Sequence, residues 1–235
     1  MEKTSTKQHW QSYWKTPDHQ PPVVHEEMLS ELQHITNIKG KKILEVGAGM
    51  GGDSVRLAEF GASVTAVDYT QESLDEIDEF AKKHNVSVDT VRGDARELPF
   101  KDEVFDIVFH QGLLEHFKDP SVILSEHVRV LKKRGYLVVD VPQAFTTYTI
   151  KKKIAIARGA WFAGWERSFS IGQLEHLMRE AGLSIVRAYG WGYYGKLHAI
   201  RNLNLGKWYE QLWGIIEKSR MKLYLNWCIG VIAQK

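Results

Sequence analysis

Glycines at positions 47, 49, 51 and 52 stand where a short apolar run ends and a helical pattern begins. Gly47, Gly49 and Gly51 fit the spacing G-x-G-x-G, and Gly47, Gly49 and Gly52 also fit the dinucleotide-binding spacing G-x-G-x-x-G. Glycines in such a turn let the backbone approach a ligand closely, and the N–H groups of the following helix can bind its polar or anionic part. The loop indicates a nucleotide-like ligand, although a tight turn without any ligand has the same spacing.

Three carboxylates lie at or near the ends of three successive apolar runs. Glu45 precedes the first glycine by two residues, Asp68 follows Gly47 by 21 positions, and Asp94 closes the run at 86–94. In an open α/β sheet the ligand binds beyond the carboxyl ends of the strands, where these side chains would meet. A carboxylate at the Asp68 position can accept hydrogen bonds from both hydroxyls of a ribose. An aspartate at a strand end is also a common helix cap, so each residue alone has a structural alternative.

Short apolar runs rich in β-branched residues alternate with helical patterns along the chain. Near-continuous apolar strands separated by helices are typical of a parallel sheet that helices cover on both faces. We therefore predict an α/β fold: a Rossmann-like, doubly wound, seven-stranded and mostly parallel sheet, with a helical and aromatic cap from the N-terminus and late insertions. The expected strands are 42–47, 63–68, 86–94, 105–111, 135–142, 183–189 and 226–234.

The same pattern divides the chain into four parts. Residues 1–39 are expected to form an N-terminal helical lid segment, and residues 40–142 a Rossmann-like ligand-binding core. Residues 143–169 follow the fifth strand as a cap insertion. Residues 170–235 complete the sheet and contain a helical insertion at about 190–225.

Longer motifs stand in order and almost without gaps over residues 41–142. They are ILEVGAGMGGDSVRLAEFGASVTAVDYT, VRGDARELPFKDEVFDIVFHQGLLEHF and PSVILSEHVRVLKKRGYLVVDVP, followed later by FSIGQLEHLMREAGLSIVRAYGW. In these motifs the chain resembles the class I S-adenosylmethionine-dependent methyltransferases, particularly the small-molecule branch with the ubiquinone and menaquinone methyltransferases (methyltransferase type 11 domain). The resemblance implies that S-adenosylmethionine is the cofactor and S-adenosylhomocysteine the product. The positions that it implies as cofactor contacts are Glu45, Gly47, Ala48, Gly49, Gly51, Asp68, Tyr69, Asp94, Ala95 and Gln111.

The resemblance also implies a role for each of these positions. Glu45 and the glycine loop would hold the methionine end of the cofactor, with Gln111 along its side, and Asp68 would bind the ribose. Tyr69 would pack on the adenine, which Asp94 and the N–H that follows it would hydrogen-bond. A carboxylate at Glu45 suits the α-amino group of the cofactor but would repel the pyrophosphate of a dinucleotide. This position therefore favours a methyltransferase over a nicotinamide-dependent oxidoreductase.

Because the sulfonium of the cofactor already activates the methyl group, such an enzyme mainly aligns an acceptor with the S–CH₃ bond and excludes water. A base is needed only when the acceptor carries a proton that must leave. We expect His110, at the end of the fourth strand, to be this base because histidine titrates near neutral pH. A rim histidine bonded to backbone is the alternative. Glu115 and His116 are interpreted as mainly structural.

Aromatic residues gather near the N-terminus and after the fifth predicted strand. Trp10, Tyr13 and Trp14 fall on one face of a predicted helix, and Trp161 and Trp165 lie in the segment after that strand. All five are expected to bind the acceptor, since aromatic rings provide apolar area and attract cations. Packing of these rings on the rest of the protein is the alternative.

The composition excludes several classes of protein. The sequence has 31 Lys and Arg against 29 Asp and Glu, a formal net charge of +2, which gives no electrostatic attraction for nucleic acid. Cys228 is the one cysteine, and no residue cluster has the spacing of metal ligands, so we expect no metal. No apolar run approaches the roughly 18 to 20 residues that span a bilayer, and the N-terminus lacks a signal-peptide core. We therefore expect a cytoplasmic protein.

The leading interpretation is a methyltransferase, monomeric or homodimeric, that acts on an O, N or C atom of a small aromatic, apolar or cationic acceptor. Two alternatives stay open: a nicotinamide-dependent oxidoreductase, and a non-catalytic protein that binds S-adenosylmethionine. An amphipathic helix predicted at 207–216 suits a lid, a dimer contact or a membrane contact.

Overall fold

A single seven-stranded sheet forms the centre of the protein. The computed structural model describes residues 6–14, 22–161, 163, 165–192, 211, 214–215 and 219–235. The strand order is β3-β2-β1-β4-β5-β7-β6. β7 runs antiparallel to both of its neighbours, and all other neighbouring strands are parallel. The strands are β1 (Lys42–Val46), β2 (Ser63–Asp68), β3 (Asp89–Arg92), β4 (Phe105–Gln111), β5 (Leu131–Pro142), β6 (Ser184–Trp191) and β7 (Cys228–Gln234).

Each of the seven predicted strands is present, so the predicted Rossmann-like fold with a mostly parallel sheet is confirmed. β5 is longer than expected because it begins at Leu131, which pairs with Phe105 on β4. The pairing then shifts register before Tyr136 joins Ile107, and Arg134 has a positive φ of 62° in this irregular stretch. The Lys-Lys-Arg-Gly segment is thus an irregular part of a strand.

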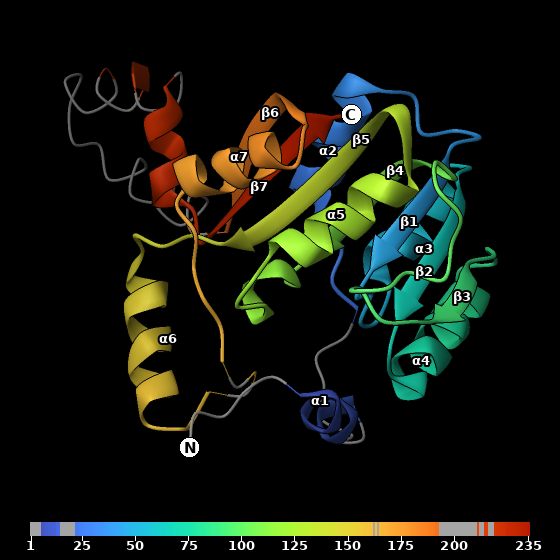
Figure 1. The fold of residues 1–235 in the computed structure, drawn as a ribbon, viewed down its shortest axis with the longest axis horizontal. Helices are drawn as coiled ribbons and strands as arrows, with labels where there is room; N and C mark the ends of the chain where they lie inside the picture. Colours follow the sequence, from blue (N-terminus) through green and yellow to red (C-terminus); the bar gives the residue numbers. More distant parts are fainter. Residues whose placement is uncertain are drawn as a thin grey trace.

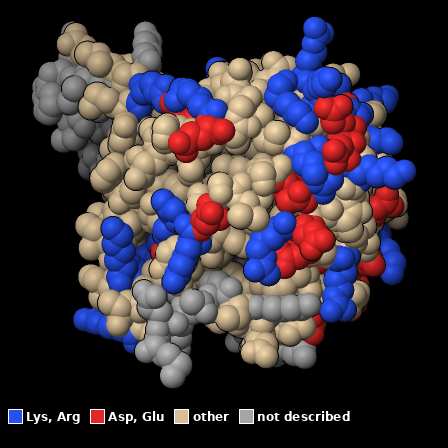
Figure 2. Space-filling view, viewed as in Figure 1, with Lys and Arg blue, Asp and Glu red and all other residues tan. Residues whose placement is uncertain are grey.

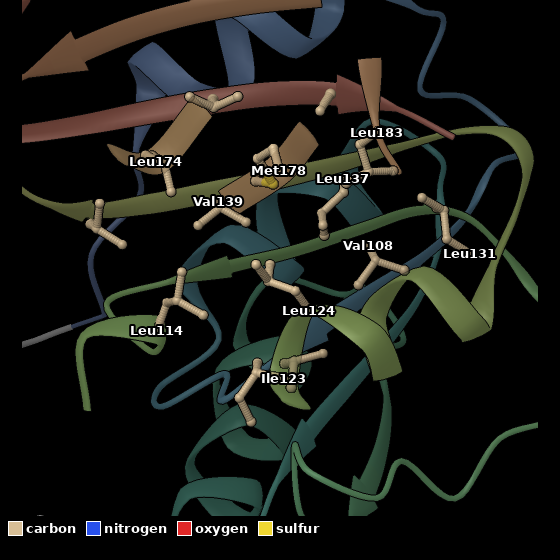
Figure 3. Close-up of a cluster of buried hydrophobic side chains, with 14 of the residues drawn as sticks. Val108, Leu114, Ile123, Leu124, Leu131, Leu137, Val139, Leu174, Met178 and Leu183 are labelled. Atoms are coloured by element: carbon tan, nitrogen blue, oxygen red, sulfur yellow. The ribbon is translucent and has the colours of Figure 1, made fainter. Parts of the chain in front are cut away.

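The helices cover both faces of the sheet (Figure 1). Apolar side chains of α2, α3 and α4 form a core layer with one face, and those of α5 and α7 form a second layer with the other. Figure 3 shows this second layer, in which Ile123 and Leu124 of α5 and Met178 of α7 face Leu137 and Val139 of β5. The helices are α1 (Lys7–Trp14), α2 (Glu26–Ile35), α3 (Gly52–Glu59), α4 (Gln71–Lys83), α5 (Ser121–Val130), α6 (Thr147–Ala157) and α7 (Ile171–Glu180).

Two helices, α1 and α6, lie beyond the end of the sheet at which β5 finishes (Figure 1). Short 3-10 turns η1 (Leu114–His116) and η2 (Arg220–Leu225) follow β4 and precede β7. The helix predicted at 207–216 falls largely outside the described residues, as do Trp208 and Trp213. No helix in the described part of the chain is long and apolar enough to cross a membrane.

Candidate active site

A cavity of about 1150 Å³ opens at the carboxyl ends of β1 to β4. Its wall is formed by the loops that follow these strands, by one face of α1 and by the segment before α2. All ten residues predicted to contact the cofactor lie in this wall. They are Glu45, Gly47, Ala48, Gly49, Gly51, Asp68, Tyr69, Asp94, Ala95 and Gln111.

The glycine loop between β1 and α3 is held in one tight conformation. Gly47 and Gly51 both have a positive φ, 68° and 64°, which a side chain would strain. A Cβ on Gly47 would lie 2.8 Å from Leu113, and a Cβ on Gly51 would lie 2.7 Å from Ile77. The Gly47 N–H donates to the carbonyl of Val67 on β2 at 2.7 Å. Backbone therefore forms the cavity floor here, and a ligand can approach it closely.

Glu45 places a buried carboxylate at the end of β1. Its side chain is 4% exposed, and the Ser54 hydroxyl donates to one of its oxygens. Burial, together with the negative charge of nearby Asp53, raises the pKa of Glu45 well above its usual range. Because two acidic groups share this buried corner, a bound cation would be favoured there.

Asp68 joins the glycine loop to the start of α4. It accepts hydrogen bonds from the Gly49 N–H at 3.3 Å, the Thr70 N–H at 2.9 Å and the Thr70 hydroxyl at 2.8 Å. Burial raises the pKa of Asp68, while the bonds from Thr70 and Gly49 act in the opposite direction. A carboxylate held in this way faces the cavity in a fixed orientation and keeps acceptor capacity for hydroxyl groups.

Asp94 lies at the outer side of the cavity, after β3. Arg96 binds both of its carboxylate oxygens, with Nε 2.9 Å from Oδ1 and Nη2 2.6 Å from Oδ2. The backbone N–H of Arg96 also donates to Oδ1. This fork fixes the plane of the Asp94 carboxylate, which can accept further hydrogen bonds from a ligand.

Helix α1 spans the cavity from the glycine loop to η1. Trp10, Tyr13 and Trp14 all line the cavity, with ring centroids 5.8 Å apart for Trp10–Tyr13 and 5.0 Å apart for Tyr13–Trp14. The Trp14 ring lies 3.4 Å from the position that a Cβ on Gly49 would occupy. At the other end, Trp10 meets His116 edge-on at 5.1 Å. The predicted aromatic face of this helix therefore faces the ligand cavity.

One polar pair in the cavity wall, His25 with Asp53, is not among the site residues predicted from the sequence. His25, just before α2, binds Asp53 twice: through its backbone N–H at 2.7 Å and through its ring Nδ1 at 2.6 Å. Burial lowers the pKa of His25, but the Asp53 carboxylate outweighs burial and leaves it raised. Trp191 packs against the His25 ring at 4.8 Å and donates to Asp140 at 2.9 Å. No local sequence signal marks this pair, because its members lie 28 positions apart.

Residues 44–139 match the methyltransferase domain family. A phosphatidylethanolamine N-methyltransferase of Cereibacter sphaeroides is 33% identical over 140 residues, which cover 57% of this chain and 68% of that protein. The chain belongs to the class I S-adenosylmethionine-dependent methyltransferases. A demethylmenaquinone methyltransferase of Renibacterium salmoninarum is 35% identical to this methyltransferase over 102 residues, 43% of the chain and 41% of that relative. The chain spans between 37% and 63% of the length of this relative and of two further curated relatives that it matches.

Solved structures show the same fold as this methyltransferase. Magnesium protoporphyrin IX methyltransferase of Synechocystis with bound S-adenosylhomocysteine superposes with a TM-score of 0.63 at 16% identity, covering 98% of this chain and 85% of that one. A S-adenosylmethionine-dependent methyltransferase of Aquifex aeolicus gives a TM-score of 0.63 at 17% identity, with coverage of 95% and 97%. Family and fold do not support the alternative of a nicotinamide-dependent oxidoreductase.

The side chain of His110 does not line the cavity of this methyltransferase. Its ring is fully buried between β4 and α5, 5.3 Å from the ring of His127, and neither ring nitrogen has a hydrogen-bond partner among the described residues. Burial lowers the pKa of His110 well below its usual range. Successive residues of a strand point to opposite faces, so Gln111 reaches the cavity and His110 points away. The prediction of His110 as a base is therefore corrected.

Trp161 and Trp165 do not line the cavity either; they contact a buried charged cluster behind it. Trp161 Nε1 donates to Glu166 at 3.0 Å, and Lys152 Nζ lies 2.9 Å from the same carboxylate. The carbonyl of Trp165 lies 3.3 Å from Nδ1 of His116. The five aromatic residues therefore do not share one cavity: the α1 rings line it, whereas Trp161 binds Glu166 and Trp165 contacts His116 through its backbone carbonyl.

His116, interpreted from the sequence as structural, is the histidine of η1 that this methyltransferase places in the cavity wall. Its Nε2 lies 4.0 Å from Glu166. Burial lowers the pKa of His116, and the Glu166 carboxylate acts against this effect. An unshifted histidine pKa lies near 6.5, so the ring is held in its neutral form at neutral pH, in which one nitrogen can accept a proton.

Proposed function

We propose that this methyltransferase transfers a methyl group from S-adenosylmethionine to a small-molecule acceptor by in-line attack on the methyl carbon. The observation that carries the proposal is the convergence of Glu45, Asp68 and Asp94, from three neighbouring parallel strands, on one cavity with a glycine-loop floor. The relatives named for demethylmenaquinone and phosphatidylethanolamine support a small molecule as the acceptor. The accepting atom would be O, N or C.

The chemistry of the cavity wall fits this cofactor group by group. The acidic corner at Glu45 suits a cationic α-amino group, and the glycine-loop N–H groups suit a carboxylate. Asp68 offers acceptors for the two ribose hydroxyls, and Tyr69 and Asp94 with its following N–H suit an adenine. Gln111 supports the fit, because its amide lies in the wall beside Asp140 and keeps hydrogen-bonding capacity for a ligand.

S-adenosylmethionine, when bound, supplies a methyl group on a positively charged sulfur. The protein must then align the acceptor and exclude water. Trp10, Tyr13 and Trp14 would do both, since they roof the cavity next to the glycine loop. Trp161 would act indirectly through the bond of its indole N–H to Glu166, and the backbone carbonyl of Trp165 would orient His116.

We propose His116 as the group that accepts a proton from an acceptor that must lose one. It lies in the cavity wall, its Nδ1 faces the Trp165 carbonyl, and Glu166 stands behind Nε2. A carboxylate beside an imidazole stabilises the protonated ring that forms during the reaction. Removing such a base typically lowers a rate by roughly 10² to 10⁴ and removes its titration from the pH–rate profile.

The direct test is equilibrium binding by calorimetry with S-adenosylhomocysteine and, separately, with NADH. We expect S-adenosylhomocysteine to bind and NADH not to bind. Asp68→Asn keeps the size of the side chain but removes its charge, so it should weaken S-adenosylhomocysteine binding by roughly tenfold or more. Asp89→Asn, an exposed position at the start of β3, is the matched control and should bind as the wild type does.

Turnover is tested with a labelled methyl donor and a small-molecule extract as the source of acceptors. Labelled product formed by the wild type supports transfer, and its loss in Asp68→Asn assigns the activity to this cavity. Binding of S-adenosylhomocysteine without any labelled product would instead support the non-catalytic alternative. Binding of NADH alone would overturn the proposed function.

A further inference from the structure

Helix α6 has its polar and apolar faces reversed relative to an ordinary surface helix. Thr149 and Lys152 are the buried residues of the helix, each 1% exposed, whereas Ile150 and Ile154 are 61% and 47% exposed. A buried charge on a helix indicates a specific role, and exposed large apolar side chains do so where they gather into a patch. The inner face is explained, because Lys152 Nζ pairs with Glu166 at 2.9 Å. The outer face differs, because no described part of the chain covers the exposed side chains of Ile150 and Ile154.

Lysines flank this apolar face. At 100° per residue, Ile150 and Ile154 lie only about 40° apart around the helix, with Lys151 to one side of them and Lys153 to the other. Lys151, Lys153 and Arg158 are all exposed. Residues 141–165 contain four basic residues, including Lys152, and neither Asp nor Glu. Figure 2 shows Lys and Arg side chains over the flank where Figure 1 places α6.

Exposed apolar side chains also occur just before α6 and on η2. Phe145, just before the helix, is 68% exposed, and its ring lies 6.3 Å from that of Tyr224 on η2. Met221, also on η2, is 59% exposed. We call Phe145, Ile150, Ile154, Met221 and Tyr224, with the lysines and the arginine beside them, the α6 surface.

We propose that the α6 surface docks the protein onto an anionic lipid bilayer. Apolar side chains would enter the headgroup region, while the flanking basic groups contact lipid phosphates. An apolar face bordered on both sides by lysine, without acidic residues in the segment, complements a negatively charged surface rather than a second apolar protein face. The docking does not depend on methyl transfer, because Ile150 and Ile154 lie on the opposite side of α6 from Lys152, which pairs with Glu166 behind the cavity.

The test is co-sedimentation of the full chain with vesicles of phosphatidylcholine alone and of phosphatidylcholine mixed with phosphatidylglycerol. We expect binding to the mixed vesicles that falls at high salt, and little binding to the neutral ones. Lys151→Glu with Lys153→Glu should weaken binding at least roughly 25-fold, from about fivefold for each cation lost. Lys82→Glu with Lys83→Glu, at exposed positions on α4, is the control of equal charge and should retain most of the binding.

The apolar contribution is tested with Ile150→Glu and Ile154→Glu together, which should reduce binding at least tenfold. Val186→Glu is the control, since this side chain is 44% exposed on β6. Thermal melting of each variant shows whether it folds, and the lysine variant tests the proposal independently of the isoleucine variant. Equal binding by all variants, no binding by the wild type, or self-association that these substitutions abolish in the absence of lipid would overturn the proposal. S-adenosylhomocysteine binding, measured in parallel, reports on the proposed function separately.

Discussion

Replacing Glu115 by glutamine should remove a large part of the pH dependence of stability. Glu115, on η1, is 3% exposed, and one of its carboxylate oxygens has no hydrogen-bond partner among the described residues. Burial, with the negative charge of Glu166, raises its pKa from 4.5 to about 8. At neutral pH the side chain is therefore largely protonated, and a glutamine reproduces its shape and its lack of charge.

The sign follows from the direction of this shift. A carboxyl whose pKa is raised in the folded state contributes stability at pH values below its unfolded pKa, and this stability is lost as the pH rises through the folded pKa. One pKa unit corresponds to about 1.4 kcal/mol, so a rise from 4.5 to about 8 is worth roughly 5 kcal/mol over the whole range. About half of it falls between pH 6 and pH 9.

Urea unfolding at several pH values between 6 and 9 measures this effect as the difference between the wild type and Glu115→Gln. The variant should gain roughly 2 to 3 kcal/mol on the wild type over this range. Taking the difference cancels other groups that titrate in both proteins, such as Asp140, whose pKa burial raises to about 6. Glu97→Gln, at an exposed position, is the control and should follow the wild-type curve. Parallel curves for Glu115→Gln and the wild type would refute the assignment of a buried, neutral Glu115.

Three further predictions concern single positions. Gly230→Ala should destabilise the protein by roughly 2 to 4 kcal/mol in urea unfolding, because a Cβ there would overlap Asp140 and Tyr189, whose side chains are hydrogen-bonded across β7. Gly172→Ala in α7 should instead stabilise it by roughly 0.5 kcal/mol in the same assay, because a Cβ there meets nothing within 4 Å. Trp14→Ala should weaken S-adenosylhomocysteine binding by roughly tenfold in calorimetry while leaving the melting temperature nearly unchanged, since the ring roofs the glycine loop.

The strands and the glycine-loop side of the cavity follow from local patterns, which explains why the sequence predicts them. Apolar runs bounded by glycine or acidic residues fix strand ends, and parallel strands bring those ends to one edge of the sheet. Glu45, Asp68 and Asp94 therefore converge as expected. The antiparallel direction of β7 cannot be read from the sequence, because a buried strand has the same apolar pattern whether it runs parallel or antiparallel to its neighbours.

The sequence predictions for the site fail where a residue's role depends on the direction in which its side chain points, or on a partner far away along the chain. The period of two along β4 allows Gln111 or His110 to face the cavity but not both, and the fold places Gln111 there. No local pattern marks His116 as a cavity residue, because its partner Glu166 lies 50 positions later, in a segment without a regular pattern. The contact between His25 and Asp53 is of the same kind.

The position of β7 in the sheet affects the order in which the protein can fold during synthesis. β5 and β6 are linked only through β7, whose residues 228–234 follow β5 by more than eighty positions along the chain. A growing chain that has passed residue 191 contains both strands but not the one that joins them, so each still has an unpaired edge. Unpaired edges attract other strands and promote aggregation. The half of the sheet that holds the glycine loop can assemble early, but the other half has to wait for β7.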